Sequence, residues 1–278
     1  MPDVWSGVAQ LDAATQERLA AVLETRGADP QQQEMRQAFL ADVGFPAQAR
    51  VLEVGCGTGV LTRVVAKRSD VAEVVGVDPA PSLLETARDI SKDIAKVSFQ
   101  VVADGTALPF DHKSFDVVMF DSTLCHVLEP DLALAEAFRV LRASGWLAVF
   151  DGDYATTTVA LGEHDPLQAC VDATMANSVN DRWLIRRLPA MAQEAGFEVI
   201  NTRSHGFVET TQGGYMLTVV DRGADILRGL GQIDQSSAEA LKAEARLRVD
   251  SGRFFGHISY ASLTAVKPGS NSAEEPSE

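Results

Sequence analysis

From Arg50 onward, short apolar runs alternate with stretches of helical character, and each run ends in a small or an acidic residue. The runs predict five successive β-strands: VLEVG, EVVGVD, VSFQVVAD, FDVVMFD and WLAVFDGD. Between some of them we expect helices at residues 60–68, 81–91 and 131–141. The runs are almost continuously apolar, as strands covered on both faces must be. This alternation predicts an α/β fold built on a doubly wound sheet of parallel strands.

The sequence predicts four regions along the chain. Residues 1–48 predict a helical N-terminal extension or cap, and residues 49–153 predict the core with its ligand-binding crevice. Residues 154–268 predict the remaining core strands with substrate-binding and lid segments, and the polar, acidic tail at 269–278 predicts disorder. Within 154–268 we expect an irregular segment with a helix, further helices at 183–195, 214–230 and 236–249, and strands at 197–205 and 254–267.

With 278 residues, 46% of them hydrophobic, the chain is long enough to bury a substantial core. Its formal net charge of −15 repels nucleic-acid phosphates and anionic lipids, so neither partner is expected. The three cysteines lack the spacing of a disulfide framework and indicate reduced thiols in a cytoplasmic protein. The N-terminal sequence has no signal-like pattern and no run is long enough to span a membrane, so neither export nor an anchor is expected.

Three glycines, Gly55, Gly57 and Gly59, lie where the first expected strand ends and the next helix begins. A doubly wound sheet opens its ligand crevice at this point. Without Cβ atoms the backbone can approach a ligand closely and adopt φ values that other residues resist. Dinucleotides and adenosyl cofactors both bind such loops, but the dinucleotide fingerprint requires a third glycine where Val60 stands.

Acidic residues lie within or at the end of the first three expected strands. Asp78 is placed to accept hydrogen bonds from both hydroxyls of a ribose, a group that dinucleotides and adenosyl cofactors share. Glu53 lies inside the first motif, and Asp104 can accept a hydrogen bond from an adenine amino group. Together the three acids favour an adenosyl cofactor over a dinucleotide.

Five motifs follow one another between Arg50 and Asp151: EVGCGTG, VDPAPSLLETAR, ADGTALPF, FDVVMFDSTLCHV and EAFRVLRASGWLAVFD. In order and spacing they resemble the class I S-adenosylmethionine-dependent methyltransferases, particularly the small-molecule branch that includes the ubiquinone and menaquinone methyltransferases. The resemblance implies a Rossmann-like, doubly wound, seven-stranded sheet with an antiparallel last strand, a helical N-terminal extension and a helical lid insertion. It also implies that residues 49–153 bind S-adenosylmethionine. The chain departs from the family's usual proline and paired glycines at residues 142–146.

The resemblance further implies which residues contact the cofactor. The backbone of residues 55–57 would pack against it, Asp78 would hold the ribose, and residues 104–106 would frame the adenine. Residues 120–122 would face the sulfonium, and Arg36 would bind the cofactor carboxylate. With the acids and glycines above, the expected contacts are Arg36, Glu53, Gly55, Cys56, Gly57, Gly59, Asp78, Pro79, Asp104, Gly105, Thr106, Phe120, Asp121 and Ser122.

His126 follows the fourth expected strand, where a methyl group would be transferred. It is the candidate general base, and the alternatives are a cap for the next helix or an inert place in the pocket. His257 and Tyr260 fall on opposite faces of the last strand, so at most one of them faces the crevice. Substrate or lid contacts are expected at Asp153, Tyr154, Tyr215, Met216 and His257.

Asp121, Asp151 and Asp153 follow the fourth and fifth strands, near positions where catechol-type methyltransferases bind magnesium. That arrangement requires an aspartate directly followed by asparagine, whereas this chain reads DGDY. No metal is therefore expected.

The fourth motif reads FDST rather than the Asn/Asp-Pro-Pro-Tyr type found in enzymes that methylate nucleobase or amide nitrogens. With the acidic net charge and no recognition domain, this favours a small, free acceptor that is neutral or cationic. We therefore expect in-line methyl transfer to an oxygen, nitrogen, carbon or sulfur atom of a small molecule, by a monomer or a homodimer. The alternatives are a non-methylating enzyme that uses the cofactor's charge, a non-catalytic S-adenosylmethionine-binding module, and a NAD-linked oxidoreductase.

Overall fold

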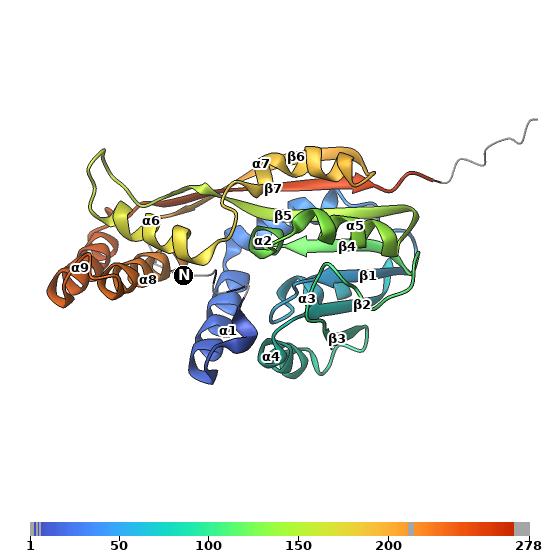
Figure 1. Cartoon of the computed structure of the whole chain (residues 1–278), viewed down its shortest axis with the longest axis horizontal. Helices are drawn as coiled ribbons and strands as arrows, with labels where there is room; N and C mark the ends of the chain where they lie inside the picture. Colours follow the sequence, from blue (N-terminus) through green and yellow to red (C-terminus); the bar gives the residue numbers. More distant parts are fainter. Residues whose placement is uncertain (1–2, 4, 6, 211–213, 270–278) are drawn as a thin grey trace, which may run out of the picture.

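The computed structural model describes residues 3, 5, 7–210 and 214–269, which are built around a seven-stranded sheet (Figure 1). The strand order is β3-β2-β1-β4-β5-β7-β6. Strands β1 to β5 run parallel, whereas β7 runs antiparallel to both of its neighbours. The predicted Rossmann-like sheet with an antiparallel last strand is therefore confirmed. The strands are β1 (Ala49–Val54), β2 (Val71–Asp78), β3 (Val97–Val101), β4 (Phe115–Asp121), β5 (Leu141–Thr158), β6 (Glu198–Glu209) and β7 (Gly256–Val266).

The strand order reverses between β1 and β4, which lie side by side at the middle of the sheet. Their register pairs Val51 with Val117 and Glu53 with Met119. From β1 the chain winds outward through β2 to β3, and from β4 it winds the other way to β5. In such sheets, ligands bind beyond the carboxyl ends of the strands at the point of reversal. The loops after β1 and β4 therefore border the place where a ligand is expected.

The second long helix begins where the sequence supplies a capping residue. The Asp29 carboxylate accepts a hydrogen bond from the backbone N–H of Gln32 at 3.0 Å, and Pro30 occupies the first turn of the helix that follows. One residue thus separates the first two long helices. The helices are α1 (Ala13–Ala28), α2 (Pro30–Ala41), α3 (Val60–Ala66), α4 (Pro81–Ser91), α5 (Pro130–Val140), α6 (Leu167–Ser178), α7 (Leu184–Glu194), α8 (Tyr215–Gly229) and α9 (Gln235–Asp250), with single 3₁₀ turns η1 (Val8–Gln10) and η2 (Leu124–His126).

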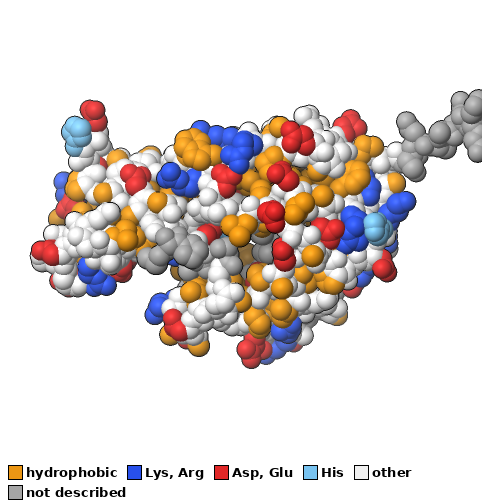
Figure 2. All heavy atoms as spheres, viewed as in Figure 1, with side chains coloured by type: hydrophobic (Ala, Val, Ile, Leu, Met, Phe, Trp, Pro, Cys, Tyr) orange, Lys and Arg blue, Asp and Glu red, His pale blue; other side chains and the backbone are white. Residues whose placement is uncertain are grey.

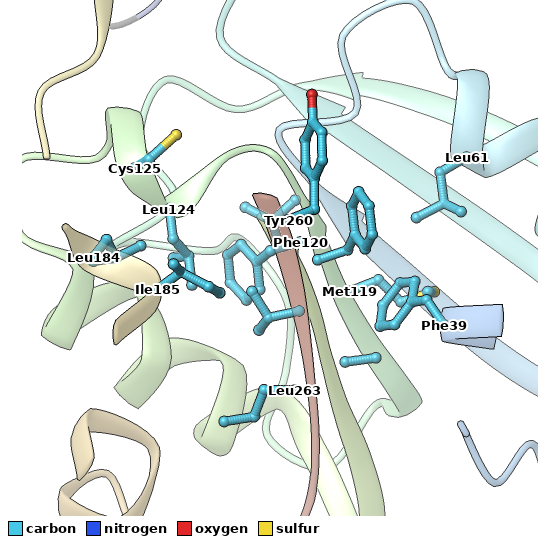
Figure 3. Close-up of a cluster of buried hydrophobic side chains, with 14 of the residues drawn as sticks. Phe39, Leu61, Met119, Phe120, Leu124, Cys125, Leu184, Ile185, Tyr260 and Leu263 are labelled. Atoms are coloured by element: carbon cyan, nitrogen blue, oxygen red, sulfur yellow. The ribbon is translucent and has the colours of Figure 1, made fainter. Parts of the chain in front are cut away.

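The central strands are buried on both faces, as their continuous apolar sequence predicts. In β4, the side chains of Val117, Val118, Met119 and Phe120 are all completely buried. Figure 3 shows Met119 and Phe120 among buried side chains that also come from α2, α7 and β7. Helices therefore cover both sides of the sheet and leave its carboxyl edge as the place for a ligand.

β5, β6 and β7 are long strands that continue past the other four strands towards α6, α8 and α9, which lie together at one end of the molecule (Figure 1). β5 and β7 pair from Trp146 opposite Val266 to Asp153 opposite Ser259, and, after a break in register, Thr158 lies opposite His257. The prediction of an irregular segment directly after Asp153 is wrong over its first residues, because β5 continues to Thr158 with a break in its pairing with β7. The boundary expected at residue 153 thus falls inside a strand.

Other differences from the predicted elements are small and have local causes. β5 begins at Leu141, which pairs with Phe115, rather than at Trp146. β3 ends at Val101, before the turn in which Asp104 accepts the backbone N–H of Thr106. β6 continues beyond residue 205 because β7 pairs with it as far as Glu209. Of the tail expected to be disordered, residues 270–278 lie outside the described residues.

Charged side chains of both signs are interspersed on the face shown in Figure 2, and acidic ones do not gather in a single patch there. The net charge of −15 is therefore not concentrated on this face. None of the helices in the described ranges combines the length and the apolar character that crossing a bilayer requires.

Candidate active site

A cavity of about 940 Å³ opens at the carboxyl edge of β1, β2 and β4, where the strand order reverses. Its volume lies near the upper end of the range for small-molecule sites, about 300–1,000 Å³. One side of the wall comes from the strand ends, and the other side comes from the N-terminal residues and the helices α1, α6 and α8. The cavity thus joins the loop after β1 to the helices that the sequence predicted as a cap and a lid.

The glycine loop forms the part of the wall that follows β1. Gly55 and Gly57 have φ values of +72° and +53°, in the left-handed region that only glycine adopts without strain. A Cβ on Gly55 would lie 2.2 Å from Thr123 Cγ2, and one on Gly57 would lie 2.8 Å from Leu23 Cδ1 on α1. The backbone N–H groups of Gly55 and Cys56 both donate to the carbonyl of Val77. The loop is therefore held against the end of β2 and closely covered by α1.

Asp78 ends β2 and connects that strand to the glycine loop. Its carboxylate accepts the backbone N–H of Gly57 at 2.8 Å and that of Ala80 at 2.9 Å. Burial raises the pKa of Asp78, and these two N–H groups oppose that rise. Because the side chain also lines the cavity, it can accept hydrogen bonds from a ligand placed on the loop. Asp104, Gly105 and Thr106 form the neighbouring part of the same wall.

An ion pair lies at the end of β4. The Arg36 Nε donates to the Asp121 carboxylate at 2.6 Å, and the two side chains are only 4% and 6% exposed. Burial opposes ionisation of Asp121, but the guanidinium of Arg36 keeps the pKa of this carboxyl below its usual value. Arg36 Nη1 is buried and has no hydrogen-bond partner in the described part of the chain. Since Arg36 lines the cavity, this donor is available to a ligand carboxylate.

Glu53 is buried beneath the same end of the sheet, beside Arg36 and Asp121 in the cavity wall. Its carboxyl accepts a hydrogen bond from the hydroxyl of Thr62 on α3. Burial raises the pKa of Glu53 to about 8. At neutral pH this group is therefore largely protonated and can donate as well as accept.

His126 lies in η2, after β4, and its ring is held by the N-terminal segment. Its Nδ1 lies 2.6 Å from the Asp3 carboxylate. The same carboxylate accepts the backbone N–H groups of Trp5 and Asn180, at 2.8 Å and 2.9 Å. A neutral histidine that donates its Nδ1 proton to a carboxylate leaves Nε2 unprotonated, as a general base requires. The fold thus places a histidine of the cavity wall beside an orienting acid from the N-terminal segment.

The comparisons with known proteins agree with this arrangement. A family model described as a methyltransferase domain matches residues 52–149. The demethylmenaquinone methyltransferase of Tropheryma whipplei (strain Twist) is 34% identical over 179 residues, covering 59% of this chain and 72% of that protein. The chain belongs to the class I S-adenosylmethionine-dependent methyltransferases.

Other relatives of this methyltransferase match over a smaller share of their length. The malonyl-[acyl-carrier protein] O-methyltransferase of Laribacter hongkongensis is 37% identical over 142 residues, which cover 49% of this chain and 46% of that protein. This chain also spans less than half the length of several further curated relatives. Among solved structures, the [4+2]-cyclase SpnF has a TM-score of 0.61 at 21% identity and covers 97% of this chain and 99% of its own. That likeness shows the shared fold.

Most of the residues that the sequence predicted for the site line the cavity of this methyltransferase. The family's cofactor is S-adenosylmethionine, and the glycine loop with its left-handed backbone and the free donor of Arg36 fit that group. The predicted residues in the wall are Arg36, Glu53, Gly55, Cys56, Gly57, Asp78, Pro79, Asp104, Gly105, Thr106, Asp121, Ser122, His126, Tyr154 and Tyr215.

Five predicted residues do not line the cavity: Gly59, Phe120, Met216, Asp153 and His257. The side chains of Phe120 and Met216 are completely buried in the core. Gly59 begins α3, and a Cβ there would lie 2.9 Å from the ring of Phe99. The carboxylate of Asp153 pairs with Arg186 at 2.8 Å, and His257 Nδ1 lies 2.9 Å from the carbonyl of Phe207. These residues have structural partners of their own.

The structure adds residues that the sequence reasoning missed. Asp3 and Trp5 contact His126 from the N-terminus, and Arg26 and Arg222 line the cavity from α1 and α8. No local motif marks any of them, because each belongs to a segment that only the folded chain brings to the strand ends. The nearest signal was the helical character of the N-terminal segment and of residues 214–230.

No group of three or more histidine, cysteine, aspartate or glutamate side chains in the described part of the molecule could hold a metal ion. The three aspartates considered for magnesium have other partners. Asp121 pairs with Arg36, and Asp153 pairs with Arg186. Asp151 is completely buried and accepts the backbone N–H groups of Cys125 and Gly152.

Proposed function

We propose that this protein transfers a methyl group from S-adenosylmethionine to a small-molecule acceptor, with His126 as the general base. The observation that carries the proposal is the single cavity that joins the glycine loop and Asp78 to His126. A cofactor seated on the loop and an acceptor beside the histidine would share that space. The reaction would then need no movement of either ligand between separate sites.

In the cofactor half, each residue has a defined task. Asp78 would accept the ribose hydroxyls, residues 104–106 would frame the adenine, and the free Nη1 of Arg36 would bind the cofactor carboxylate. When bound, the cofactor supplies a methyl group already activated on a sulfonium. The protein's own task is to hold the acceptor in line with that methyl group and to exclude water.

In the acceptor half, the N-terminal residues and helices α1, α6 and α8 line the part of the cavity beside His126. An acceptor hydroxyl, thiol or acidic carbon must lose a proton as it attacks, and His126 Nε2 would take it. The Asp3 carboxylate, 2.6 Å from Nδ1, would hold the ring in the required tautomer and stabilise the imidazolium that forms. Asp3 therefore acts as a positioning residue.

Calorimetric titration of the purified protein with S-adenosylmethionine tests the cofactor assignment. We expect micromolar binding, about −8 kcal/mol, and no binding of NAD in the same buffer. Asp78→Asn should weaken the cofactor about tenfold or more, because it removes the charge that the ribose hydroxyls contact. The matched control is Asp70→Asn, which changes an aspartate paired with Arg68 just before β2 and should leave binding unchanged.

Transfer itself is followed with a methyl-labelled cofactor and a panel of small acceptors. Label in a product, lost in His126→Gln while cofactor affinity is kept, supports both the reaction and the base. Binding of NAD in place of S-adenosylmethionine would contradict the proposal. A product without a new methyl group would instead identify an enzyme that uses the cofactor's charge for another reaction.

We also propose a cytoplasmic location for this protein. Cys56, Cys125 and Cys170 are all buried free thiols, which suits a reducing compartment. Cell fractionation tests this, and recovery of the protein from an exported fraction would contradict it.

A further inference from the structure

Arg26 and Arg222 line the cavity without forming an ion pair in the described part of the chain, although the Asp121 carboxylate attracts Arg26 from beyond ion-pair distance. Arg26 lies near the end of α1 and Arg222 lies within α8, and both line the cavity. Among the described residues, neither guanidinium makes a hydrogen bond or an ion pair with protein, and Arg26 Nε is buried without an acceptor. Both side chains are only half-buried, because part of their surface faces the cavity.

The acidic residues of α8 that line the cavity do not form ion pairs with these arginines. Asp221 pairs with Arg246 at 2.7 Å, and Asp225 pairs with Lys242 at 2.7 Å, so α9 neutralises both. Arg222 lies between these two acids in the sequence and is left without such a partner. The wall that α8 presents to the cavity therefore carries an excess positive charge.

The two guanidinium groups act on one tyrosine that also lines the cavity, Tyr215. Burial raises the pKa of the Tyr215 phenol, and both Arg26 and Arg222 oppose that rise, so both lie within electrostatic reach of it. The Asp3 carboxylate also attracts Arg222, but it is already bound to His126 and Asn180. Burial lowers the pKa of Arg222. An anion in the cavity would stabilise the charged guanidinium of Arg222 and so oppose that lowering of its pKa.

A guanidinium group that faces an enclosed, largely apolar space is costly unless an anion neutralises it. Met175, Val219 and Ile226 line the same region and supply no charge. The planar fork of an arginine side chain matches a carboxylate in two parallel hydrogen bonds. A ligand with a carboxylate would therefore satisfy donors that the protein itself leaves unsatisfied.

We propose that the acceptor is a small carboxylic acid whose carboxylate binds Arg222 and Arg26. The inference rests on the proposed function and names its substrate class. It differs from the neutral or cationic acceptor expected from the net charge, because the charge of a whole chain does not describe the lining of one cavity. The carboxylate would anchor one end of the acceptor and leave the other end for His126 and the methyl group.

The test uses the full-length protein saturated with S-adenosylhomocysteine. Calorimetry compares five acids with their primary amides: benzoate, 4-hydroxybenzoate, phenylacetate, 3-phenylpropionate and hexanoate. We expect at least one acid to bind about 10- to 100-fold more tightly than its amide. Arg222→Met should abolish that preference, whereas Arg228→Met, a change to an exposed arginine of the same helix outside the cavity wall, should keep it.

Arg26→Met shows whether Arg26 binds the carboxylate of the acceptor or the carboxylate of the cofactor. It should weaken the acid and leave the affinity for S-adenosylhomocysteine unchanged; weaker cofactor binding with unchanged acid binding would overturn Arg26 as an acceptor contact. The absence of an acid preference in all five pairs, or a preference that survives Arg222→Met, would overturn the inference. In either case normal binding of S-adenosylhomocysteine leaves the proposed function intact, whereas failure to bind that ligand and S-adenosylmethionine contradicts the proposed function itself.

Discussion

Gly55 carries two separate constraints, a left-handed backbone and a close neighbour. Its φ is +72°, and a Cβ there would lie 2.2 Å from Thr123 Cγ2. Left-handed backbone costs an L-residue about 1–2 kcal/mol, and overpacking of a closed site costs about 1–3 kcal/mol. Gly55→Ala should therefore lower the free energy of unfolding by about 2–5 kcal/mol.

Two other glycines separate these contributions. Gly252 has a φ of +66° but open space around its missing Cβ, so Gly252→Ala should cost only the backbone part, about 1–2 kcal/mol. Gly206 in β6 has neither constraint, and Gly206→Ala should leave stability unchanged or slightly higher. Thr123→Ala removes the two atoms nearest to the added Cβ, so in the Gly55→Ala background it should recover most of the overpacking cost.

Urea denaturation followed by tryptophan fluorescence measures all of these variants, and Thr123→Ala alone completes the double-mutant cycle. The reasoning is refuted if Gly55→Ala costs no more than Gly252→Ala, because the close neighbour would then have no energetic effect. It is equally refuted if Thr123→Ala destabilises the protein as much in the Gly55→Ala background as in the parent.

The other predictions concern two of the buried acids, Asp3 and Glu53. Asp3→Asn should lower kcat by about 10²- to 10⁴-fold without changing cofactor affinity, and His126→Gln should add little to that loss because the two residues act as a unit. Burial raises the pKa of Glu53 from 4.5 to about 8, so its contribution to stability is complete below pH 4.5 and is lost as the pH rises through 8. Relative to the parent, Glu53→Gln should therefore gain stability between pH 5 and pH 8, and urea midpoints that stay parallel over this range would contradict the prediction.

The cofactor side of the cavity could be predicted from sequence because its residues follow strand ends. A run of apolar residues that ends in an acidic residue predicts both the strand and the edge of the sheet at which the acidic side chain lies, as for Asp78. Phe120 shows where this reasoning fails. It lies one residue before the end of β4, and successive side chains of a strand point to opposite faces, so Phe120 enters the core while Asp121 meets Arg36.

The acceptor side could not be predicted, because its contacts join distant parts of the chain. Asp3 and His126 are 123 residues apart, and no sequence motif contains both of them. Arg222 occurs in an amphipathic helix whose charged residues look alike in sequence. Only the packing of α9 shows that Asp221 and Asp225 are neutralised while Arg222 is not.

The long strands β5 and β7 have a consequence for how such a protein can diversify. The family model ends at residue 149, within β5, and the same strand then continues to Thr158 and leads into the helices of the acceptor half. The part that the family model matches and the helices of the acceptor half are thus joined by one strand. Descendants of one ancestor can exchange the helices beyond residue 158 for others, and so acquire a new substrate, while the machinery that binds the methyl donor is inherited unchanged.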